Sequence, residues 1–266
     1  MRGFVPLLFL LIALPASAFD QGHITLNALL RQHVRVIDGG VASRVDYAGI
    51  KRDRAALDAY TQSLSALPET TFNRWARADQ MAFLIDAYNA FTLELILTRY
   101  PGLQSIKDLG GLFSSPWQQD FFTLLGTKTH LDHIEQDLLR APGRYDDPRI
   151  HFALTCASLG CPMLRDEAYV GAHLDAQLDD AMRRFLTDRS RNRYDPAADK
   201  LLVSKIFDWY GQDFDQGHHG FTSVAQTLAQ FADQLADAPG ARARIRIGQV
   251  PIDFRAYDWG LNDVGR

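Results

Sequence analysis

The chain has 266 residues, of which 47% are hydrophobic and 23% charged, and its formal net charge is −4. This composition is typical of a globular protein and excludes a disordered chain, collagen, a coiled coil and a small disulfide-stabilised scaffold. The mild acidity and the lack of a clustered basic segment argue against nucleic acid as a partner.

The first eighteen residues have the pattern of a secretory signal peptide. Met1–Gly3 is short and basic, Phe4–Leu14 is an almost unbroken apolar run, and Ala16-Ser17-Ala18 is an A-x-A cleavage site. We therefore expect cleavage after Ala18 and a periplasmic or secreted mature protein. The alternative is an uncleaved anchor, but the apolar run is shorter than the roughly 20 residues that a membrane span requires. No membrane span is expected after cleavage.

Residues 19–266 contain no internal repeat or low-complexity linker, so we expect a single domain. The hydrophobic periodicity and the turn residues of the first half predict three helices and two hairpins. The expected helices are Ile24–Val36, Arg54–Leu64 and a buried central helix over Asp79–Arg99, and the expected hairpins are Val34–Ile37 with Arg44–Tyr47 and Phe121–Leu125 with Thr127–Leu131.

The second half is predicted to begin with a helix from Asp132 to Leu139, with Glu135 in the reciprocal position of a capping box. The apolar run Ile150–Thr155 is typical of a short buried strand. The remaining expected elements are helices over Leu174–Leu186, Ser204–Tyr210 and Val224–Ala236, and a closing hairpin of Arg244–Ile247 with Ile252–Tyr257. The fold class is therefore α+β, with more helix than strand.

Five motifs, in order along the chain, carry a family resemblance. They are Tyr88-Asn89-Ala90, Leu131–Glu135 with Arg140, Asp147–Pro162, Ser204–Tyr210, and Tyr257-Asp258-Trp259 with Leu261-Asn262. On these motifs, residues 45–260 or thereabouts resemble the domain of unknown function 547 family of bacterial, archaeal and plant proteins. Relatives of that family are similar to papain-like and transglutaminase-like cysteine hydrolases. The resemblance implies a helix-rich papain-like or transglutaminase-like core with a small antiparallel sheet, and a thiol nucleophile.

Carried over from the family, Cys156 is the candidate nucleophile, and Cys161, which is often serine in the family, is dispensable. The residues themselves are consistent with this interpretation, because a cysteine between a buried strand and a small-residue turn is exposed enough to react. A helix beginning there would lower the thiol pKa and supply amides for an oxyanion. The alternative is a structural cysteine, buried or bridged to Cys161, since an oxidising compartment permits that disulfide. Two cysteines and scattered histidines make a poor zinc site, so we expect no metal, and no cofactor is implied.

The catalytic base is predicted less directly. His151 matches a family position, but in an extended strand it lies roughly 16 Å from Cys156 and points to the opposite face. A direct pair requires a bend near Ala153–Thr155, and without it His151 is a structural residue. Glu135, which belongs to a family motif, is a candidate for orienting a histidine, and its alternative role is the helix cap.

Two further residues are candidates for substrate binding. Asn89 lies on the buried central helix, where an amide requires partners and can orient an imidazole or an oxyanion. Lys205 begins a helix, where it can contact an anion or depress a thiol pKa, although such a lysine is more often solvated or paired. The family often has Asn where this chain has Asp86. Aromatic residues near these motifs are expected in the core or in groove walls: Trp209, Tyr210, Tyr257 and Trp259.

These observations favour an exported cysteine hydrolase that cleaves peptide-like amide bonds, such as isopeptide or γ-glutamyl bonds, through a thiol acyl-enzyme. Transfer of the acyl group to an amine, as in a transglutaminase, is the alternative reaction of the same acyl-enzyme. The expected partner is a small peptide-like substrate, and the sequence does not define an oligomeric state. The alternative is a non-catalytic binding or assembly module on the same fold. A histidine nitrogen within about 4 Å of the Cys156 sulfur would favour the enzyme.

Overall fold

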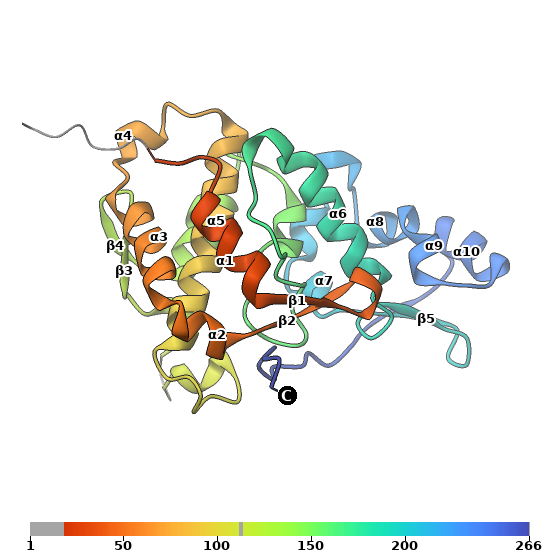
Figure 1. Ribbon diagram of the computed structural model, residues 1–266. Helices are drawn as coiled ribbons and strands as arrows, with labels where there is room; N and C mark the ends of the chain where they lie inside the picture. The colour runs from red at the N-terminus through yellow and green to blue at the C-terminus, as the bar shows by residue number, and fades with distance from the viewer. Residues whose placement is uncertain (1–18, 112–113, 266) are drawn as a thin grey trace, which may run out of the picture.

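The computed structural model describes residues 19–111 and 114–265, so the expected signal peptide, residues 1–18, lies outside the described residues. These described residues form many helices and three small sheets (Figure 1). The helices are α1 (Ile24–His33), α2 (Tyr47–Arg52), α3 (Arg54–Ala66), α4 (Glu69–Phe72), α5 (Arg77–Leu97), α6 (Leu174–Thr187), α7 (Ile206–Trp209), α8 (Val224–Gln230), α9 (Ala232–Leu235) and α10 (Pro239–Arg246). The strands are β1 (Val34–Ile37), β2 (Ala42–Val45), β3 (Phe122–Leu124), β4 (Thr127–Thr129), β5 (Arg193–Asp195), β6 (Lys200–Val203) and β7 (Ile252–Phe254). Within the described ranges, no helix is both long and apolar enough to cross a membrane.

Helix α5 is the centre of the larger hydrophobic core. Its apolar residues surround the helix axis, so it is stable only where other elements cover it on every side. Figure 1 shows α1 and α3 beside it. Three buried polar residues, Asp86, Asn89 and Thr92, recur at intervals of three and therefore share one face of the helix. Asp86 accepts a hydrogen bond from the backbone N–H of Tyr169, so this face binds loops that follow much later in the chain.

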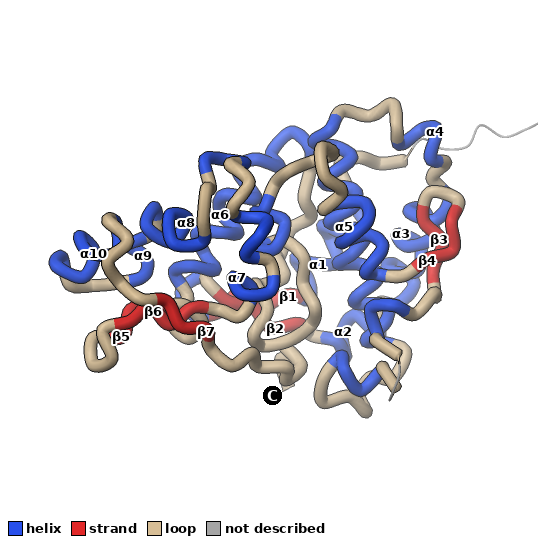
Figure 2. The backbone as a smooth tube through the Cα atoms, turned by 180° about the vertical axis from the view of Figure 1, so that it is seen from behind, coloured by secondary structure: helices blue, strands red, loops and turns tan. Residues whose placement is uncertain are grey.

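A second hydrophobic core lies among α6 to α10 and the sheet of β5, β6 and β7, which Figure 2 shows together on one side of the molecule. The segment around Phe152 connects the two cores. The Phe152 ring packs in the second core, 5.3 Å from the ring of Phe185, whereas its neighbours Ile150 and Ala153 belong to the first. The chain that leads to Cys156 is therefore held between the two cores.

Much of the first half agrees with the sequence-based expectation. The predicted helices correspond to α1, α3 and the buried α5, and both predicted hairpins form as antiparallel pairs, β1 with β2 and β3 with β4. The helix predicted over Leu174–Leu186 is α6. The prediction of a mixed, helix-rich fold is confirmed at this level.

The strand predicted over Ile150–Thr155 is wrong. Residues Pro148–Phe152 form a 3₁₀ helix, η5, because Pro148 fixes its first turn and the Asp147 carboxylate accepts the N–H of Arg149 at 3.0 Å. The run is continuously apolar because its side chains enter two cores rather than the two faces of a sheet.

The C-terminal half contains the other errors. The segment predicted as a strand over Arg244–Ile247 ends helix α10, and β7 pairs in parallel with β6 rather than in a closing hairpin. The sheet content is accordingly three small sheets, one of them mixed, rather than one antiparallel sheet. The helix predicted over Val224–Ala236 is divided at Phe231 into α8 and α9, and that predicted over Ser204–Tyr210 is the single turn α7.

Candidate active site

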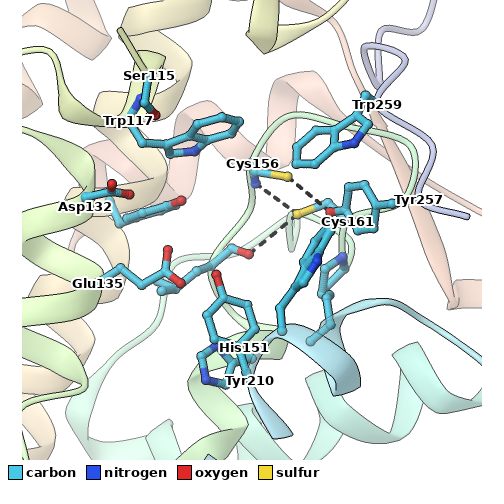
Figure 3. Close-up of a pocket in the computed structure, with 15 residues that line it drawn as sticks. Ser115, Trp117, Asp132, Glu135, His151, Cys156, Cys161, Tyr210, Tyr257 and Trp259 are labelled. Carbon is cyan, nitrogen blue, oxygen red and sulfur yellow. Dashed lines mark hydrogen bonds between the residues drawn. The ribbon is translucent and has the colours of Figure 1, made fainter. Parts of the chain in front are cut away.

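A cavity of about 350 Å³ lies between the two cores and contains both cysteines in its wall (Figure 3). The remaining wall combines two carboxylates, an imidazole and several aromatic rings. The residues that line it are Tyr88, Ser115, Trp117, Asp132, Glu135, His151, Leu154, Cys156, Cys161, Pro162, Ile206, Trp209, Tyr210, Tyr257 and Trp259.

Asn89 fixes the backbone just before Cys156. Its Nδ2 donates to the carbonyl oxygen of Ala153 at 3.0 Å, and its Oδ1 accepts from the N–H of Thr155 at 2.9 Å. Both contacts are buried, so the amide satisfies a donor and an acceptor that no water reaches. Asn89 is not among the residues that line the cavity, so its predicted role in substrate binding gains no support from this geometry and stays a prediction. It is a positioning residue for the Cys156 segment.

The loop after Cys156 is bound to a segment about a hundred residues later. The N–H groups of Leu159 and Gly160 donate to the carbonyl oxygens of Gly260 and Asp258, each at 2.8 Å. A Cβ on Gly160 would lie 2.9 Å from the backbone nitrogen of Asp258, so only glycine permits this approach. No helix begins at Cys156, so the expectation that helix N-terminal amides act on its thiol is wrong.

Hydroxyl groups surround the Cys156 sulfur instead. The Cys156 Sγ lies 3.0 Å from the Ser158 Oγ and 3.2 Å from the Tyr257 Oη, and these two hydroxyl oxygens are themselves 3.2 Å apart. Hydrogen bonds from the Cys161 thiol and from these two hydroxyls outweigh burial and lower the pKa of Cys156 to about 7. A substantial fraction of Cys156 is therefore thiolate at neutral pH.

Both cysteines are free thiols in this structure. The Cys161 Sγ accepts the N–H of Cys156 at 2.9 Å and lies 3.7 Å from the carbonyl oxygen of Leu154. Burial raises the pKa of Cys161 well above its ordinary value, so this thiol stays protonated. Cys161 therefore supports the neighbouring thiolate, a role that the family pattern alone did not assign.

His151 lines the cavity but is not paired with the thiol. Its Nε2 lies 2.7 Å from the Asp213 carboxylate, and its ring stacks on Tyr210 with the centroids 3.9 Å apart. In the described part of the chain, the side-chain partners of the Cys156 sulfur include hydroxyls and a thiol but no histidine. Because His151 lies in the 3₁₀ helix η5, the distance to Cys156 that was expected for an extended strand does not apply. The histidine nevertheless forms no direct hydrogen bond with the Cys156 thiol.

Asp213 connects several groups behind the cavity. Its carboxylate accepts two hydrogen bonds from the Arg140 guanidinium, at 2.7 and 2.8 Å, in addition to the contact with His151. Burial opposes ionisation of Asp213, but these hydrogen bonds outweigh it and hold the carboxyl pKa below its ordinary value. Asp213 thus positions His151 and, through the stacked ring, Tyr210.

We predict that Asp213→Asn lowers the free energy of unfolding by about 2 kcal/mol at pH 7, because charged hydrogen bonds to Arg140 are lost. The contribution of a carboxylate with a lowered folded-state pKa is present above the unfolded value of about 3.9 and is lost as the pH falls below it. The difference between the variant and the unchanged protein is therefore expected to shrink below about pH 4, in urea unfolding measured across pH. Asp215→Asn, at an exposed neighbouring position, is the control and is expected to have little effect at any pH. A pH-independent difference for Asp213→Asn contradicts the assignment.

Glu135 is not part of a capping box. The side chain of Asp132 makes no capping hydrogen bond, because this residue already has helical φ and ψ, and the following segment η4 (His133–Leu139) is a π-helix. The N–H of Arg140 bonds to the carbonyl oxygen of Glu135 at 3.0 Å, five residues back. The Glu135 side chain instead enters the cavity, next to the Tyr210 hydroxyl, whose pKa is raised by burial and by this carboxylate. Glu135 does not contact a histidine, so the triad role predicted for it is not formed.

Lys205 lies outside the cavity. Its Nζ forms an ion pair with Asp208 at 2.7 Å, and the residue lines a different depression on the surface. The ion pair agrees with the alternative of a paired lysine, and the expected role of Lys205 in substrate binding at Cys156 gains no support from this geometry and stays a prediction. The next residue, Ile206, lines the cavity in its place.

Sequence reasoning missed two functional features. Tyr257 was expected as a wall residue, which is confirmed, but its hydroxyl contact with the thiol was not foreseen. Asp213 was not considered, because it lies in no motif and is 62 residues from His151. A buried histidine needs a hydrogen-bond partner, and this requirement is the only sequence signal that points to a distant carboxylate.

Comparison with known proteins supports the family but not a function. Residues 72–186 match the model of the family described as "Protein of unknown function, DUF547", which supports the family predicted from the motifs. The match includes α5, η4 and the Cys156 loop, and it is shorter than the range over which the motifs extend. No curated protein and no solved structure matches the chain.

Proposed function

We propose that this protein is an exported cysteine hydrolase that cleaves peptide-like amide bonds with Cys156 as nucleophile. The observation that carries the proposal is a thiol with a pKa of about 7 in the wall of a cavity large enough for a small substrate. The relationship to papain-like and transglutaminase-like enzymes, the periplasmic or secreted location and the isopeptide or γ-glutamyl substrates are parts of this proposal, supported by the sequence motifs.

The geometry favours a preformed thiolate rather than a thiol activated by histidine. The Cys156 thiolate attacks the amide carbonyl, and the C–N bond of the tetrahedral intermediate breaks to leave a thioester. The leaving nitrogen requires a proton, and we assign its donation to the hydroxyl of Tyr257, which already contacts the sulfur. Water then attacks the thioester and returns its proton to Tyr257, which restores the thiolate and releases the acid.

The proposal is tested by the pH dependence of alkylation of Cys156 with iodoacetamide, followed by peptide mapping. The expected midpoint is about 7, below the value of about 8.5 for an ordinary thiol. Tyr257→Phe removes one hydrogen-bond donor to the thiolate and is expected to raise the midpoint by about one pH unit. Tyr194→Phe, whose hydroxyl contacts Asp199 far from this cavity, is the control and is expected to leave the midpoint unchanged.

A non-catalytic binding or assembly module is the second candidate. The observation that favours it is the engagement of His151 with Asp213 and Tyr210 instead of the thiol. If Cys156 is alkylated only with a midpoint near 8.5, the nucleophile assignment fails and the binding module is the better interpretation.

A further inference from the structure

One wall of the cavity carries two carboxylates that form no ion pair with the described residues. Asp132 and Glu135 both line it, and Glu135 is only 6% exposed. Among the described residues, neither carboxylate takes part in an ion pair, and the neighbouring Arg140 is engaged by Asp213 and Gln136. Glu135 accepts a hydrogen bond from the Tyr210 hydroxyl and interacts electrostatically with Arg140, but the wall itself presents two carboxylates and no lining lysine or arginine among the described residues, so it is suited to a ligand that brings a positive charge.

The rest of the cavity wall is aromatic. The Trp259 ring lies 5.8 Å from the rings of both Trp117 and Trp209, and Tyr257 packs against it at 4.6 Å. Figure 3 shows the Trp117 and Trp259 indoles and the two carboxylates around the same space as the sulfurs. Indole faces attract cations, and the Lys107 Nζ lies 3.8 Å from the Trp259 ring centroid in this structure.

The formally charged side chains that line the cavity are both negative. No lysine or arginine of the described chain lines the cavity, and His151 is held by Asp213. An anionic substrate group would therefore meet the like charges of the two carboxylates, whereas an ammonium group would meet carboxylates and ring faces.

We infer that the cavity selects substrates that carry a primary ammonium group and that Asp132 and Glu135 bind it. This inference rests on the proposed function for the role of Cys156 as nucleophile, and it narrows the substrates to amides with a free amine close to the scissile bond. Lysine-derived isopeptides with a free amino group and γ-glutamyl amides both carry such an amine, but the free α-carboxylate of a γ-glutamyl group would be repelled by Asp132 and Glu135.

Charged thiol reagents test the inference without any knowledge of the substrate. The full-length protein is treated with methanethiosulfonates that carry a 2-aminoethyl, a methyl or a 2-sulfonatoethyl group, and modification of Cys156 is followed by mass spectrometry. Each rate is divided by the rate of the same reagent with a small free thiol, and the cationic and anionic rates are then compared with that of the neutral methyl reagent. The cationic reagent is expected to react at least about tenfold faster than the anionic one.

Variants of the two carboxylates test whether they cause the faster reaction with the cationic reagent. Asp132→Asn and Glu135→Gln are each expected to lower the cationic-to-anionic ratio several-fold, and the double variant is expected to bring it close to one. Asp137→Asn removes the same charge from the same helix at an exposed side chain outside the cavity, and it is expected to leave the ratio unchanged. Because Asp132 is only partly buried, its variant supplies the test even if Glu135→Gln does not fold.

The outcomes separate the two proposals. Rapid modification of Cys156 by all three reagents without a charge preference overturns the ammonium inference and leaves the nucleophile assignment intact. A preference that Asp137→Asn removes as completely as Asp132→Asn also overturns the inference, because overall charge then explains it. Slow modification by all three reagents contradicts the proposed function itself.

Discussion

Replacing Cys156 with alanine is expected to lower acyl transfer from p-nitrophenyl acetate on the order of 10³-fold or more. The reason is that Cys156 is held partly as the thiolate at neutral pH, whereas the Cys161 thiol in the same wall is buried and protonated. The measurement is the burst and steady-state release of p-nitrophenol, with mass spectrometry to detect the acyl group on the protein.

Cys161→Ser is the matched control for this experiment. A serine hydroxyl can accept the N–H of Cys156 in place of the sulfur, so the acyl transfer rate is expected to remain within about tenfold of the unchanged protein. Acylation of the Cys156→Ala protein at an undiminished rate would contradict the assignment of the nucleophile. If the burst is lost in Cys161→Ser but kept in Cys156→Ala, the nucleophile is Cys161 and the assignment of Cys156 is wrong.

Asn89→Ala is expected to lower the free energy of unfolding by about 2–4 kcal/mol. The substitution leaves the carbonyl of Ala153 and the N–H of Thr155 buried without partners, and each such group costs about 1–3 kcal/mol. Urea unfolding measures the loss. In the folded variant, the segment before Cys156 is no longer fixed, so the alkylation midpoint of Cys156 is expected to move toward 8.5.

Thr92→Val provides the comparison on the same helix. Thr92 is as deeply buried as Asn89, but its hydroxyl has no hydrogen-bond partner among the described residues. Replacement with an apolar group of similar shape is therefore expected to change the stability by less than about 1 kcal/mol. Equal losses for both variants would mean that helix packing, rather than the two hydrogen bonds of Asn89, determines the effect.

The parts of the fold that could be predicted from the sequence are those with a local cause. Helix α5 is apolar on every side, and Gly39 and Gly126 lie in the turns between antiparallel strands, so periodicity and turn residues are sufficient. The segment Ile150–Thr155 shows the opposite case. Its continuous apolar character results from packing between two cores, and a one-dimensional pattern does not distinguish this arrangement from a buried strand.

The same distinction applies to the candidate site. Cys156 could be singled out because its motif is contiguous, and the cavity places Glu135 and His151 in the same wall. The partners of the thiol could not be predicted, because Tyr257 is 101 residues away and acts through a hydroxyl that no local pattern marks. Lys205, which borders a different depression, illustrates the same point: a helix start indicates where a lysine lies in the chain but not which surface depression it borders.

The long-range contact of Tyr257 with Cys156 makes thiol reactivity a property of the assembled chain. Before residues 257–260 dock on the loop after Cys156, the thiol lacks the Tyr257 hydroxyl and lies in solvated chain, where its pKa is that of an ordinary cysteine. A mostly protonated thiol is slow in thiol–disulfide exchange at neutral pH, so an incompletely folded molecule is poorly able to form mixed disulfides through Cys156. The nucleophile thus acquires its reactivity late in folding, when the cavity that restricts access to it is also complete.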